Sequence, residues 1–440
     1  MPAAALLLLL LVIWAATHVS FNWTREEVPT QNARLKARTA AIKQAQRGAS
    51  STIDYGRLDA RLQQLAANDA MVGLAVGVVE NGEISFLKGY GETVAGSGDS
   101  VTPETVFRWA SVSKGVAGVM VAKLASEGKL SLADPIAKYS ASLRLPGGRE
   151  QQATVADVLA HRLGIYGHAN DSKLEDGMDP RFLRSQLATL NQICPVGQCH
   201  SYQNVAYDAA SDVVEKVTGV SYREAIRQRL FDPLGMTSAS ATREGLLSAR
   251  SWARPHRGGK SSKPVEVTQP YYNVPAAGGV NSSIKDMAVW MQAQMGLDPA
   301  VLPKDVIEAV QTPLIATPGE RRRMRNFTER LGGTSYGLGW RIYEYAGHRI
   351  ITHRGGVTGY RAVIMFDPVK KSGIVALWNS STNKPSGLEF EVMDMIYQLP
   401  FRDWMKLDGA APAPVPAPAP APAPAEGPDQ ANSALTNAHS

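Results

Sequence analysis

The stretch Phe107-Arg108-Trp109-Ala110-Ser111-Val112-Ser113-Lys114 decides how the rest of the chain is interpreted. A strand-like run leads into Ser111. Apolar residues then recur at helical spacing from Val112 to Glu127, and Gly128 stands where a helix would end. Ser111 and Lys114 are therefore expected about one turn apart, on one face of a helix start. A lysine partly removed from water there can take a proton from the neighbouring hydroxyl, so the pair predicts a serine nucleophile.

The pattern Ser-x-x-Lys is not specific by itself, because other matches begin at Ser85, Ser126, Ser282 and Ser381. Ser85 lies in an alternating strand pattern, Ser126 ends a helical pattern, and Ser381 lies in a polar loop. Ser282 precedes a helix, but it is more simply one of two N-cap candidates. Only the match at Ser111 places the serine and lysine at a helix start that favours developing negative charge.

Two further short motifs follow in order. Tyr202-Gln203-Asn204 precedes an apolar helix expected at about 204–216, and His353-Arg354-Gly355-Gly356 is expected to end one strand and to open a Gly-rich turn. Each motif has a second match, at Tyr271-Tyr272-Asn273 and at His256-Arg257-Gly258. The second His-x-Gly match lies in a polar, Lys-rich loop in which no strand is expected.

Composition and charge are typical of a globular protein and argue against one that binds nucleic acid. The chain has 440 residues, of which 44% are hydrophobic and 20% charged, so it can bury a substantial core. Its 46 basic and 40 acidic residues leave a net charge of only +6. The densest basic cluster, Arg321-Arg322-Arg323-Met324-Arg325, is short and carries no aromatic ladder, which argues against a nucleic-acid partner.

The two ends of the chain differ in composition from the rest. The uncharged run from Ala3 to Ala16 is shorter than the ~20 residues that span a bilayer, so residues 1–20 are expected to form a secretory signal peptide or an uncleaved signal anchor. Residues 21–52 are polar and basic, and they are expected to form a tether or a loose helix. The Ala/Pro-rich tail, 408–440, is expected to be extended or disordered. We therefore expect a periplasmic or secreted protein, with membrane anchoring by the N-terminal segment as an alternative.

Two cysteines, Cys194 and Cys199, flank a Pro/Gly turn just before Tyr202. In an exported protein we expect a local disulfide between them, and two buried thiols are the alternative. A zinc site is not expected, because His200 is the only nearby nitrogen ligand and a structural site needs about four ligands.

Strand patterns lie at both ends of the sequence, with helical patterns between them. The dipeptide Asn81-Gly82 between two apolar runs predicts a β-hairpin. Helices are expected at 54–67 and about 388–399, the hairpin strands at 72–79 and 84–90, and later strands at 336–345, 349–353, 361–366 and 373–378. These elements predict an α+β fold, in which helices flank an antiparallel sheet built from N- and C-terminal segments. A mainly helical second lobe is expected at about 154–277, with a cleft between the lobes.

The ordered motifs resemble those of the serine penicillin-recognising superfamily, especially its branch of class C β-lactamases, DD-peptidases and D-aminopeptidases. The resemblance extends from about residue 60 to residue 400. It is strengthened by Leu159-Ala160-His161-Arg162-Leu163-Gly164-Ile165, by Pro275-Ala276-Ala277-Gly278-Gly279-Val280-Asn281-Ser282-Ser283, and by Tyr336-Gly337-Leu338-Gly339-Trp340. It implies a β-lactamase/transpeptidase-like hydrolase domain over residues 53–402, which uses neither a metal nor an organic cofactor.

The resemblance also implies residue roles. Ser111 would attack a carbonyl and form an acyl-enzyme, with Lys114 as its base or as the cation that keeps a neighbour deprotonated. Tyr202 would carry a proton to the leaving group and then help to activate water. Asn204 would hold a substrate amide. Structural roles are the alternatives for two of these residues: Tyr202 as a core tyrosine and Asn204 as an N-cap.

The last motif would line the cleft. His353 and Gly355 would face the substrate there, and the missing side chain of Gly355 would let an extended substrate approach the strand. The backbone N–H groups of Ser111 and Gly356 would form an oxyanion hole. As alternatives, His353 would be a satisfied strand-end histidine and the glycines would serve a tight turn.

The motif at His353 departs from the Lys-Thr-Gly of typical β-lactamases. An imidazole that is largely neutral at pH 7 replaces an ammonium that grips a substrate carboxylate. This favours DD-peptidase, D-amino-acid amidase or esterase activity on a small-molecule or peptide substrate, peptidoglycan included. The alternatives are a class C-like β-lactamase and a non-catalytic, penicillin-binding-like sensor module of the cell envelope. No GxSxG or HExxH motif supports an α/β-hydrolase or a zincin.

Overall fold

The computed structural model describes residues 51–409. The expected signal segment at 1–20, nearly all of the tether and nearly all of the Ala/Pro-rich tail lie outside the described residues. Within residues 51–409, no helix is long and apolar enough to cross a membrane.

The N-terminal helix and hairpin form as predicted. Helix α3 (Tyr55–Ala67) begins after Asp54, whose side chain accepts a hydrogen bond from the backbone N–H of Arg57. Strands β1 (Gly73–Glu80) and β2 (Glu83–Gly91) pair across the predicted turn. In that turn Asn81 and Gly82 have φ values of 52° and 88°, a left-handed conformation that these two residue types tolerate best.

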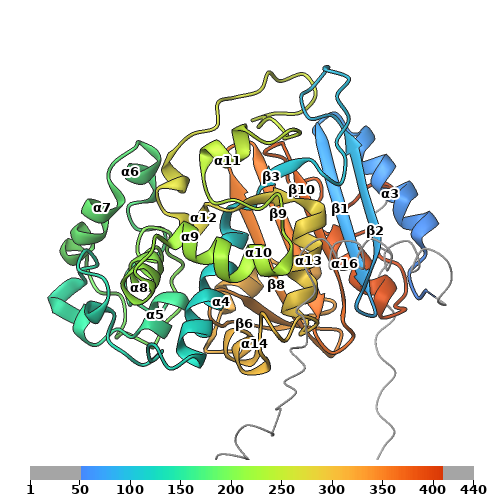
Figure 1. Cartoon of the computed structure of the whole chain (residues 1–440). Coiled ribbons are helices and arrows are strands. Elements are labelled where there is room, and N and C mark those ends of the chain that lie inside the picture. The colour runs from blue at the N-terminus through green and yellow to red at the C-terminus, as the bar shows by residue number, and fades with distance from the viewer. Residues whose placement is uncertain (1–50, 410–440) are drawn as a thin grey trace, which may run out of the picture.

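Eight antiparallel strands form one sheet, in the order β2-β1-β10-β9-β8-β7-β6-β5 (Figure 1). Beyond the hairpin, its strands are β5 (Ile315–Ala316), β6 (Leu331–Tyr336), β7 (Arg341–Tyr345), β8 (His348–Val357), β9 (Tyr360–Asp367) and β10 (Ser372–Trp378). Strand β1 pairs directly with β10, so that Leu74 lies opposite Trp378. The sheet is thus assembled from the two ends of the chain, and the predicted α+β fold is confirmed.

Two strand predictions were wrong. The single strand expected over 336–345 is two strands, β6 and β7, joined by a turn in which Gly339 has a φ of 82°. A Cβ atom at Gly339 would lie 2.3 Å from the carbonyl oxygen of Lys114, so this turn packs directly on the chain beside the lysine. The motif at His353 does not end a strand: β8 continues to Val357, because β9 pairs with it as far as Tyr360.

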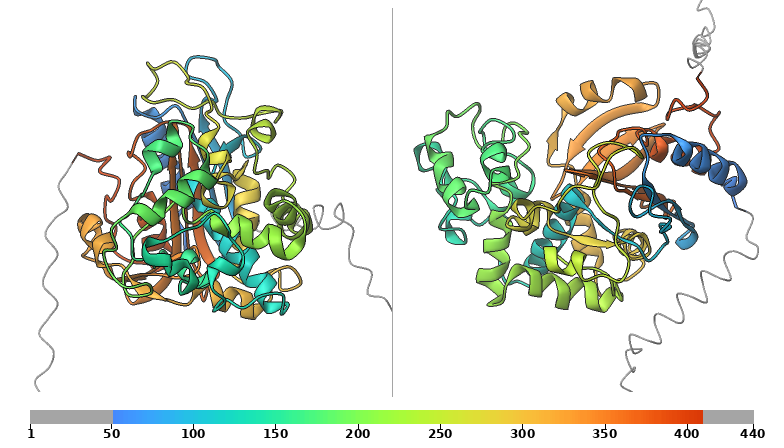
Figure 2. Two further views of the ribbon diagram at one scale, coloured as in Figure 1. Left: turned by 90° about the vertical axis from the view of Figure 1, so that its left-hand side faces the viewer. Right: turned by 90° about the horizontal axis from the view of Figure 1, so that it is seen from above.

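Both faces of the sheet are covered (Figure 2). The covering helices are α3 and α16 (Leu388–Ile396) on one face, and α13 (Ile284–Gln294) on the other. Side chains alternate along β1 accordingly. Leu74, Val76 and Val78 join the core beside α3 and α16, whereas Ala75 and Val79 join the core beside α13. This second core continues through α4 (Ser113–Ser126) into the helical region.

The middle of the chain is mainly helical, as predicted. Its helices are α5 (Val155–Leu159), α6 (Asp171–Glu175), α7 (Pro180–Gln186), α8 (Ala209–Thr218), α9 (Tyr222–Ile226), α10 (Asp232–Leu234), α11 (Arg243–Leu247) and α12 (Pro275–Gly278), and helices α14 (Lys304–Gln311) and α15 (Pro318–Arg323) follow. Helix α8 ends at Gly219, which has a φ of 75°, as expected. It begins at Ala209 rather than near Asn204, so residues 202–208 are largely irregular.

Candidate active site

The chain turns sharply at the predicted nucleophile. Strand β3 (Val106–Arg108) leads into a short 3₁₀ helix, η1 (Ala110–Val112), and α4 begins only at Ser113. Ser111 therefore lies just before the α-helix rather than in its first turn. Ala110 has a φ of 48°, a conformation that costs a residue with a side chain about 1 kcal/mol. This strained turn leaves Ser111 partly exposed, while Lys114 is fully buried.

The ammonium nitrogen of Lys114 contacts three neutral oxygen atoms. It lies 3.3 Å from Oγ of Ser111, 2.6 Å from Oδ1 of Asn204 and 2.9 Å from the carbonyl oxygen of Ala277. Burial lowers the pKa of Lys114 from its usual 10.5 to about 7, against the opposing effect of Asp171. A substantial fraction of this lysine is therefore uncharged at neutral pH.

The three contacts suit the uncharged amine. Its two N–H groups can donate to Asn204 and Ala277, whose carbonyl oxygens can only accept. The lone pair is then left for the hydroxyl of Ser111. The site thus places a free base beside the predicted nucleophile.

Tyr202 lies beside both residues and is half-buried, so it is not a core tyrosine. The centre of its ring is 4.7 Å from Nζ of Lys114, and the Ser111 side chain lies close enough to act on the pKa of its hydroxyl. Burial raises the pKa of Tyr202 above its usual 10, although Arg341, 5.5 Å from the ring, opposes this shift. The phenol therefore keeps its proton at neutral pH and can donate it.

Asn204 is not an N-cap, since α8 begins five residues later. Its Oδ1 accepts from Lys114, and its Nδ2 donates to Oδ2 of Asp171 at 2.6 Å. Asn204 thereby joins the buried amine to a carboxylate that the sequence did not single out.

His353 is fully buried, and both of its ring nitrogens have partners. The backbone N–H of Gln203 donates to Nδ1 of His161 at 3.1 Å, which leaves Nε2 of His161 to donate to the hydroxyl of Tyr336 at 3.2 Å. Tyr336 in turn donates to Nε2 of His353 at 3.0 Å, and Nδ1 of His353 donates to the carbonyl of Arg354 at 2.9 Å. His353 therefore supports the site from behind and has no free ring nitrogen for a substrate.

Burial keeps both histidines of this chain of hydrogen bonds uncharged. It lowers the pKa of His353 well below the usual 6.5, with further contributions from Arg341 and Lys114. It lowers the pKa of His161 in the same way. A neutral imidazole at His353 agrees with the sequence-based expectation, whereas the expected contact between His353 and a substrate is replaced by the bond to Tyr336.

Gly355 is needed for packing rather than for access. A Cβ atom at this position would lie 2.1 Å from the carbonyl oxygen of Trp109 and 3.1 Å from the backbone nitrogen of Ser111. The glycine therefore allows β8 to lie against the nucleophile turn, which corrects the expectation that it makes room for a substrate.

Gly356 is exposed. It lies beyond Thr352, where the pairing of β8 with β7 stops.

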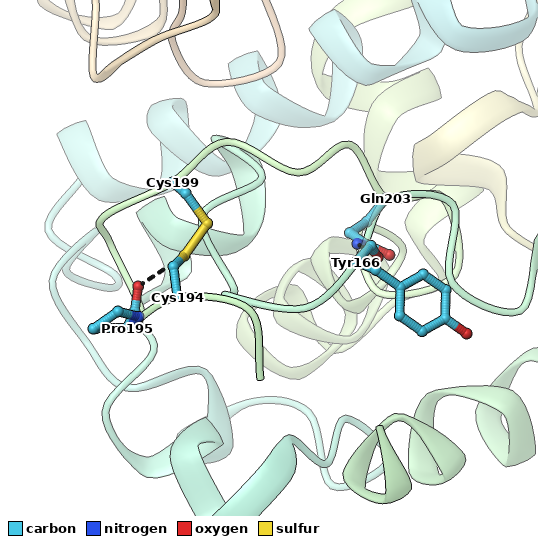
Figure 3. Close-up of a disulfide and its surroundings, with 5 residues drawn as sticks. All are labelled: Tyr166, Cys194, Pro195, Cys199 and Gln203. Atoms are coloured by element: carbon cyan, nitrogen blue, oxygen red, sulfur yellow. Dashed lines mark hydrogen bonds between the residues drawn. A yellow bond between two sulfur atoms is a disulfide. The ribbon is translucent and has the colours of Figure 1, made fainter. Parts of the chain in front are cut away.

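The disulfide expected between Cys194 and Cys199 is present, and it closes a loop next to the site (Figure 3). Backbone hydrogen bonds of 2.8 Å join this loop to the preceding segment, from Ile193 to Gly164, from Gly197 to Arg162 and from Ser201 to His161. Figure 3 also shows Gln203 beside Tyr166, to whose carbonyl oxygen the Gln203 side chain donates at 2.7 Å. The disulfide loop thus belongs to the support of the Tyr202 segment.

Sequence reasoning missed four side chains of the site: His161, Asp171, Tyr336 and Arg341. His161 and Tyr336 lie in segments whose only signal in the sequence is the resemblance to a family. Arg341 pairs with Glu320 at 2.9 Å and lies over the rings of Tyr202 and Tyr336. Neither Arg341 nor Asp171 carried a local signal, because only folding brings their elements to the site.

The Beta-lactamase family model matches residues 58–392, which is most of the chain and contains all of these groups. The chain belongs to the Beta-lactamase family. Among solved structures it is similar to a penicillin-binding protein homologue from Pyrococcus abyssi, with a TM-score of 0.70 and 27% identity over 79% of this chain and 78% of that one. A class C β-lactamase shares the fold, with a TM-score of 0.64 and 22% identity over 79% of this chain and 97% of that one.

The curated relatives of this family member include a hydrolase. An unguisins hydrolase of Aspergillus violaceofuscus is 26% identical over 75% of this chain and 63% of its own length. Protein flp of Staphylococcus aureus is 26% identical over 70% of this chain and 59% of its own length. The chain therefore spans about three fifths of these relatives. A D-stereospecific amidohydrolase from Streptomyces sp. shares the fold, with a TM-score of 0.56 and 19% identity over 74% of this chain and 94% of that one.

Proposed function

We propose that this protein is an exported hydrolase that cleaves amide or ester bonds through an acyl-enzyme on Ser111. The observation that carries the proposal is the environment of Lys114, whose amine is fully buried among neutral partners and lies 3.3 Å from the hydroxyl of Ser111. A lysine with a pKa of about 7 is both present as a free base and strong enough to accept the serine proton.

In the acylation step, Lys114 takes the proton of Ser111 as Oγ attacks the substrate carbonyl. The negative charge that develops on the carbonyl oxygen would be met by the backbone N–H groups of Ser111 and Gly356, each worth about 3 kcal/mol. As the tetrahedral intermediate collapses, Tyr202 donates its proton to the leaving nitrogen or oxygen and is reprotonated from Lys114. The raised pKa of Tyr202 supports this role, because only a protonated phenol can act as the acid.

Water then cleaves the acyl-enzyme. Tyr202 and Lys114 together would accept a proton from the attacking water and return one to Ser111, which restores the starting state. Asn204, held between Lys114 and Asp171, would also contact the substrate amide.

Peptide amides and D-amino-acid amides are the favoured substrates. The first relatives above include a hydrolase named for unguisins and a D-stereospecific amidohydrolase. The buried, neutral imidazole of His353 supplies no ammonium to grip a β-lactam carboxylate. The uncharged N-terminal run and the disulfide support export, where peptidoglycan peptides are an accessible substrate.

Labelling with a fluorophosphonate probe tests the nucleophile. Wild-type protein and Ser85→Ala, a control at another Ser-x-x-Lys match, should both be labelled, whereas Ser111→Ala should not. Labelling of Ser111→Ala at the wild-type rate would remove Ser111 from the mechanism. Tyr202→Phe should keep the fold and lower turnover about 100-fold.

Substrate class is tested by mass spectrometry of the protein after exposure to D-amino-acid amides, acyl esters and β-lactams. We expect a transient adduct and fast turnover with the amides or esters. Faster turnover of a chromogenic cephalosporin would favour a β-lactamase instead. An adduct that forms but is released only over hours with every compound would favour an envelope sensor.

A further inference from the structure

Two neighbours decide how the side chain of Asn204 is oriented. The carboxylate of Asp171 can only accept, and the protonated form of Lys114 can only donate. Both contacts are 2.6 Å long, so Oδ1 of Asn204 must face Lys114 and Nδ2 must face Asp171. If the amide rotated by half a turn, it would place N–H groups against the lysine and an oxygen against the carboxylate.

The segment that carries Asp171 is itself attached to the Tyr202 motif. The backbone N–H of His168 donates to the carbonyl oxygen of Tyr202 at 2.7 Å, and Asp171 donates its own N–H to the carbonyl of His168 at 3.2 Å. The imidazole of His168 lies 2.8 Å from Oδ2 of Asp171, the same oxygen that accepts from Asn204. The turn from His168 to Asp171, at the start of α6, therefore holds Tyr202 by its backbone and Asn204 by its side chain.

Asp171 also acts on the charge of Lys114. Its carboxylate is the strongest of the neighbours that favour the protonated lysine, followed by Asp208 on the segment before α8, while Arg341 on β7 opposes them. His161, His353, Tyr202 and Tyr207 also surround the amine, and burial keeps all four uncharged. Because Asn204 lies between Asp171 and Lys114, the carboxylate acts on the lysine without forming a direct ion pair.

We infer that Asp171 is a positioning residue for the reaction proposed above. It fixes the rotation of Asn204, so that a carbonyl oxygen holds one N–H of Lys114 and the lone pair is directed at Ser111. Its negative charge also favours the protonated lysine, so that burial lowers the pKa of Lys114 less than it otherwise would. The inference rests on the proposed function only for the expected effect of Asp171 on turnover. The orientation of Asn204 and the effect on the pKa of Lys114 do not require a substrate.

Two substitutions separate the hydrogen bond from the charge. Oδ1 of Asp171 is buried and has no hydrogen-bond partner among the described residues. In Asp171→Asn the new NH₂ group can occupy that position, so the remaining oxygen still accepts from Asn204 while the charge is lost. Asp171→Ala removes both. Glu175→Gln is the matched control, since Glu175 lies on the same helix but bonds to the hydroxyl of Tyr271.

The first measurement is the titration of Lys114 by NMR of protein labelled with ¹³Cε-lysine, with the signal assigned from Lys114→Met. We expect its pKa to fall by about one unit in Asp171→Asn and Asp171→Ala, and to stay unchanged in Glu175→Gln. The second measurement is turnover of a D-amino-acid amide against pH. Asp171→Asn should keep at least about a third of the plateau rate, with its acid limb moved to lower pH, and Asp171→Ala should lose about tenfold at every pH.

An unchanged pKa of Lys114 in both Asp171 variants, together with wild-type turnover, would overturn the inference. A second result would also overturn it: turnover is lost in Asp171→Ala and is not recovered in Asp171→Asn, while the pKa of Lys114 stays unchanged in both. A residue that only supports the fold would give that result. If the proposed function fails and no amide or ester is turned over, the lysine titration still decides the role of Asp171. Thermal unfolding of each variant checks that the fold is kept.

Discussion

Two buried cations lie close together in the helical region, and the protein surrounds them differently. Arg184 is 1% exposed and pairs with the carboxylates of Asp208 at 3.0 Å and Asp212 at 3.3 Å. Lys114 is 0% exposed, and its hydrogen bonds go to a hydroxyl, an amide oxygen and a backbone carbonyl. The first arrangement balances a permanent charge, whereas the second makes a charge easy to lose.

The difference shows why burial alone does not decide whether a cation keeps its charge. Burial opposes the charged form of any cation, and a contacting carboxylate restores it. The same carboxylate, Asp208, touches Arg184 directly and affects Lys114 only from a distance. The pKa of Asp208 is itself raised to about 6 by burial, against the effect of Arg184. The contrast predicts opposite responses when each cation is removed.

Arg184→Met should show the largest effect, and on stability. It leaves the buried carboxylate of Asp208 and the half-buried carboxylate of Asp212 without their cation, so we expect the free energy of unfolding to fall by about 3–5 kcal/mol in urea melts at pH 7. Arg181→Met is the control, because Arg181 is exposed and lies 3.8 Å from Glu215, and it should change this free energy by less than about 0.5 kcal/mol. Equal free energies of unfolding for Arg184→Met and Arg181→Met would contradict the proposed difference between Arg184 and Lys114.

Lys114→Met should affect turnover rather than stability. Turnover and the rate of fluorophosphonate labelling should each fall about 100-fold or more, because the base is gone. The free energy of unfolding should change far less than in Arg184→Met, since the gain from no longer burying an amine offsets the loss of its hydrogen bonds to Asn204 and Ala277. Lys88→Met, at another Ser-x-x-Lys match, should keep wild-type turnover and serves as the control. Near-wild-type turnover in Lys114→Met would remove this lysine from the mechanism.

Removal of the disulfide tests how far the support of Tyr202 depends on its loop. In the double variant Cys194→Ala/Cys199→Ala we expect the free energy of unfolding to fall by roughly 2 kcal/mol, because the closed loop is short. The backbone bonds to the 161–166 segment remain, so turnover should fall less than threefold. A loss of turnover as large as that in Tyr202→Phe would show that the disulfide, rather than these bonds, positions the tyrosine.

The pH should change both turnover and stability through the protonation of Lys114. Turnover should rise with pH through about 7 as Lys114 loses its proton, and should be about tenfold lower at pH 6 than on the plateau.

The protonation of Lys114 also affects the free energy of unfolding. Its pKa is lower in the folded protein than the usual 10.5, so the unfolded chain binds the proton more tightly and the free energy of unfolding should rise from pH 7 to 10.5. Part of this slope should be absent in Lys114→Met, and an identical slope there would contradict the assignment.

Local features of the sequence were sufficient for several parts of the structure. The hairpin at Asn81-Gly82 and the end of α8 at Gly219 follow from residues that tolerate left-handed backbone. The pairing of Ser111 with Lys114 follows from a spacing of three residues in a helical turn. Errors occurred where distant contacts override local preference: β8 continues through its glycines because β9 pairs with it.

By itself, the sequence determined which chemical groups are available and in what order: a serine and a lysine one turn apart, then a tyrosine, then a glycine-rich strand. The tertiary structure decided the surroundings of these groups. Burial of Lys114, the orientation of Asn204 by Asp171 and the approach of Gly355 to Trp109 each join segments far apart in the chain. A pKa depends on how much water and which charges surround a group, and those surroundings exist only once the sheet and the helical region have packed together.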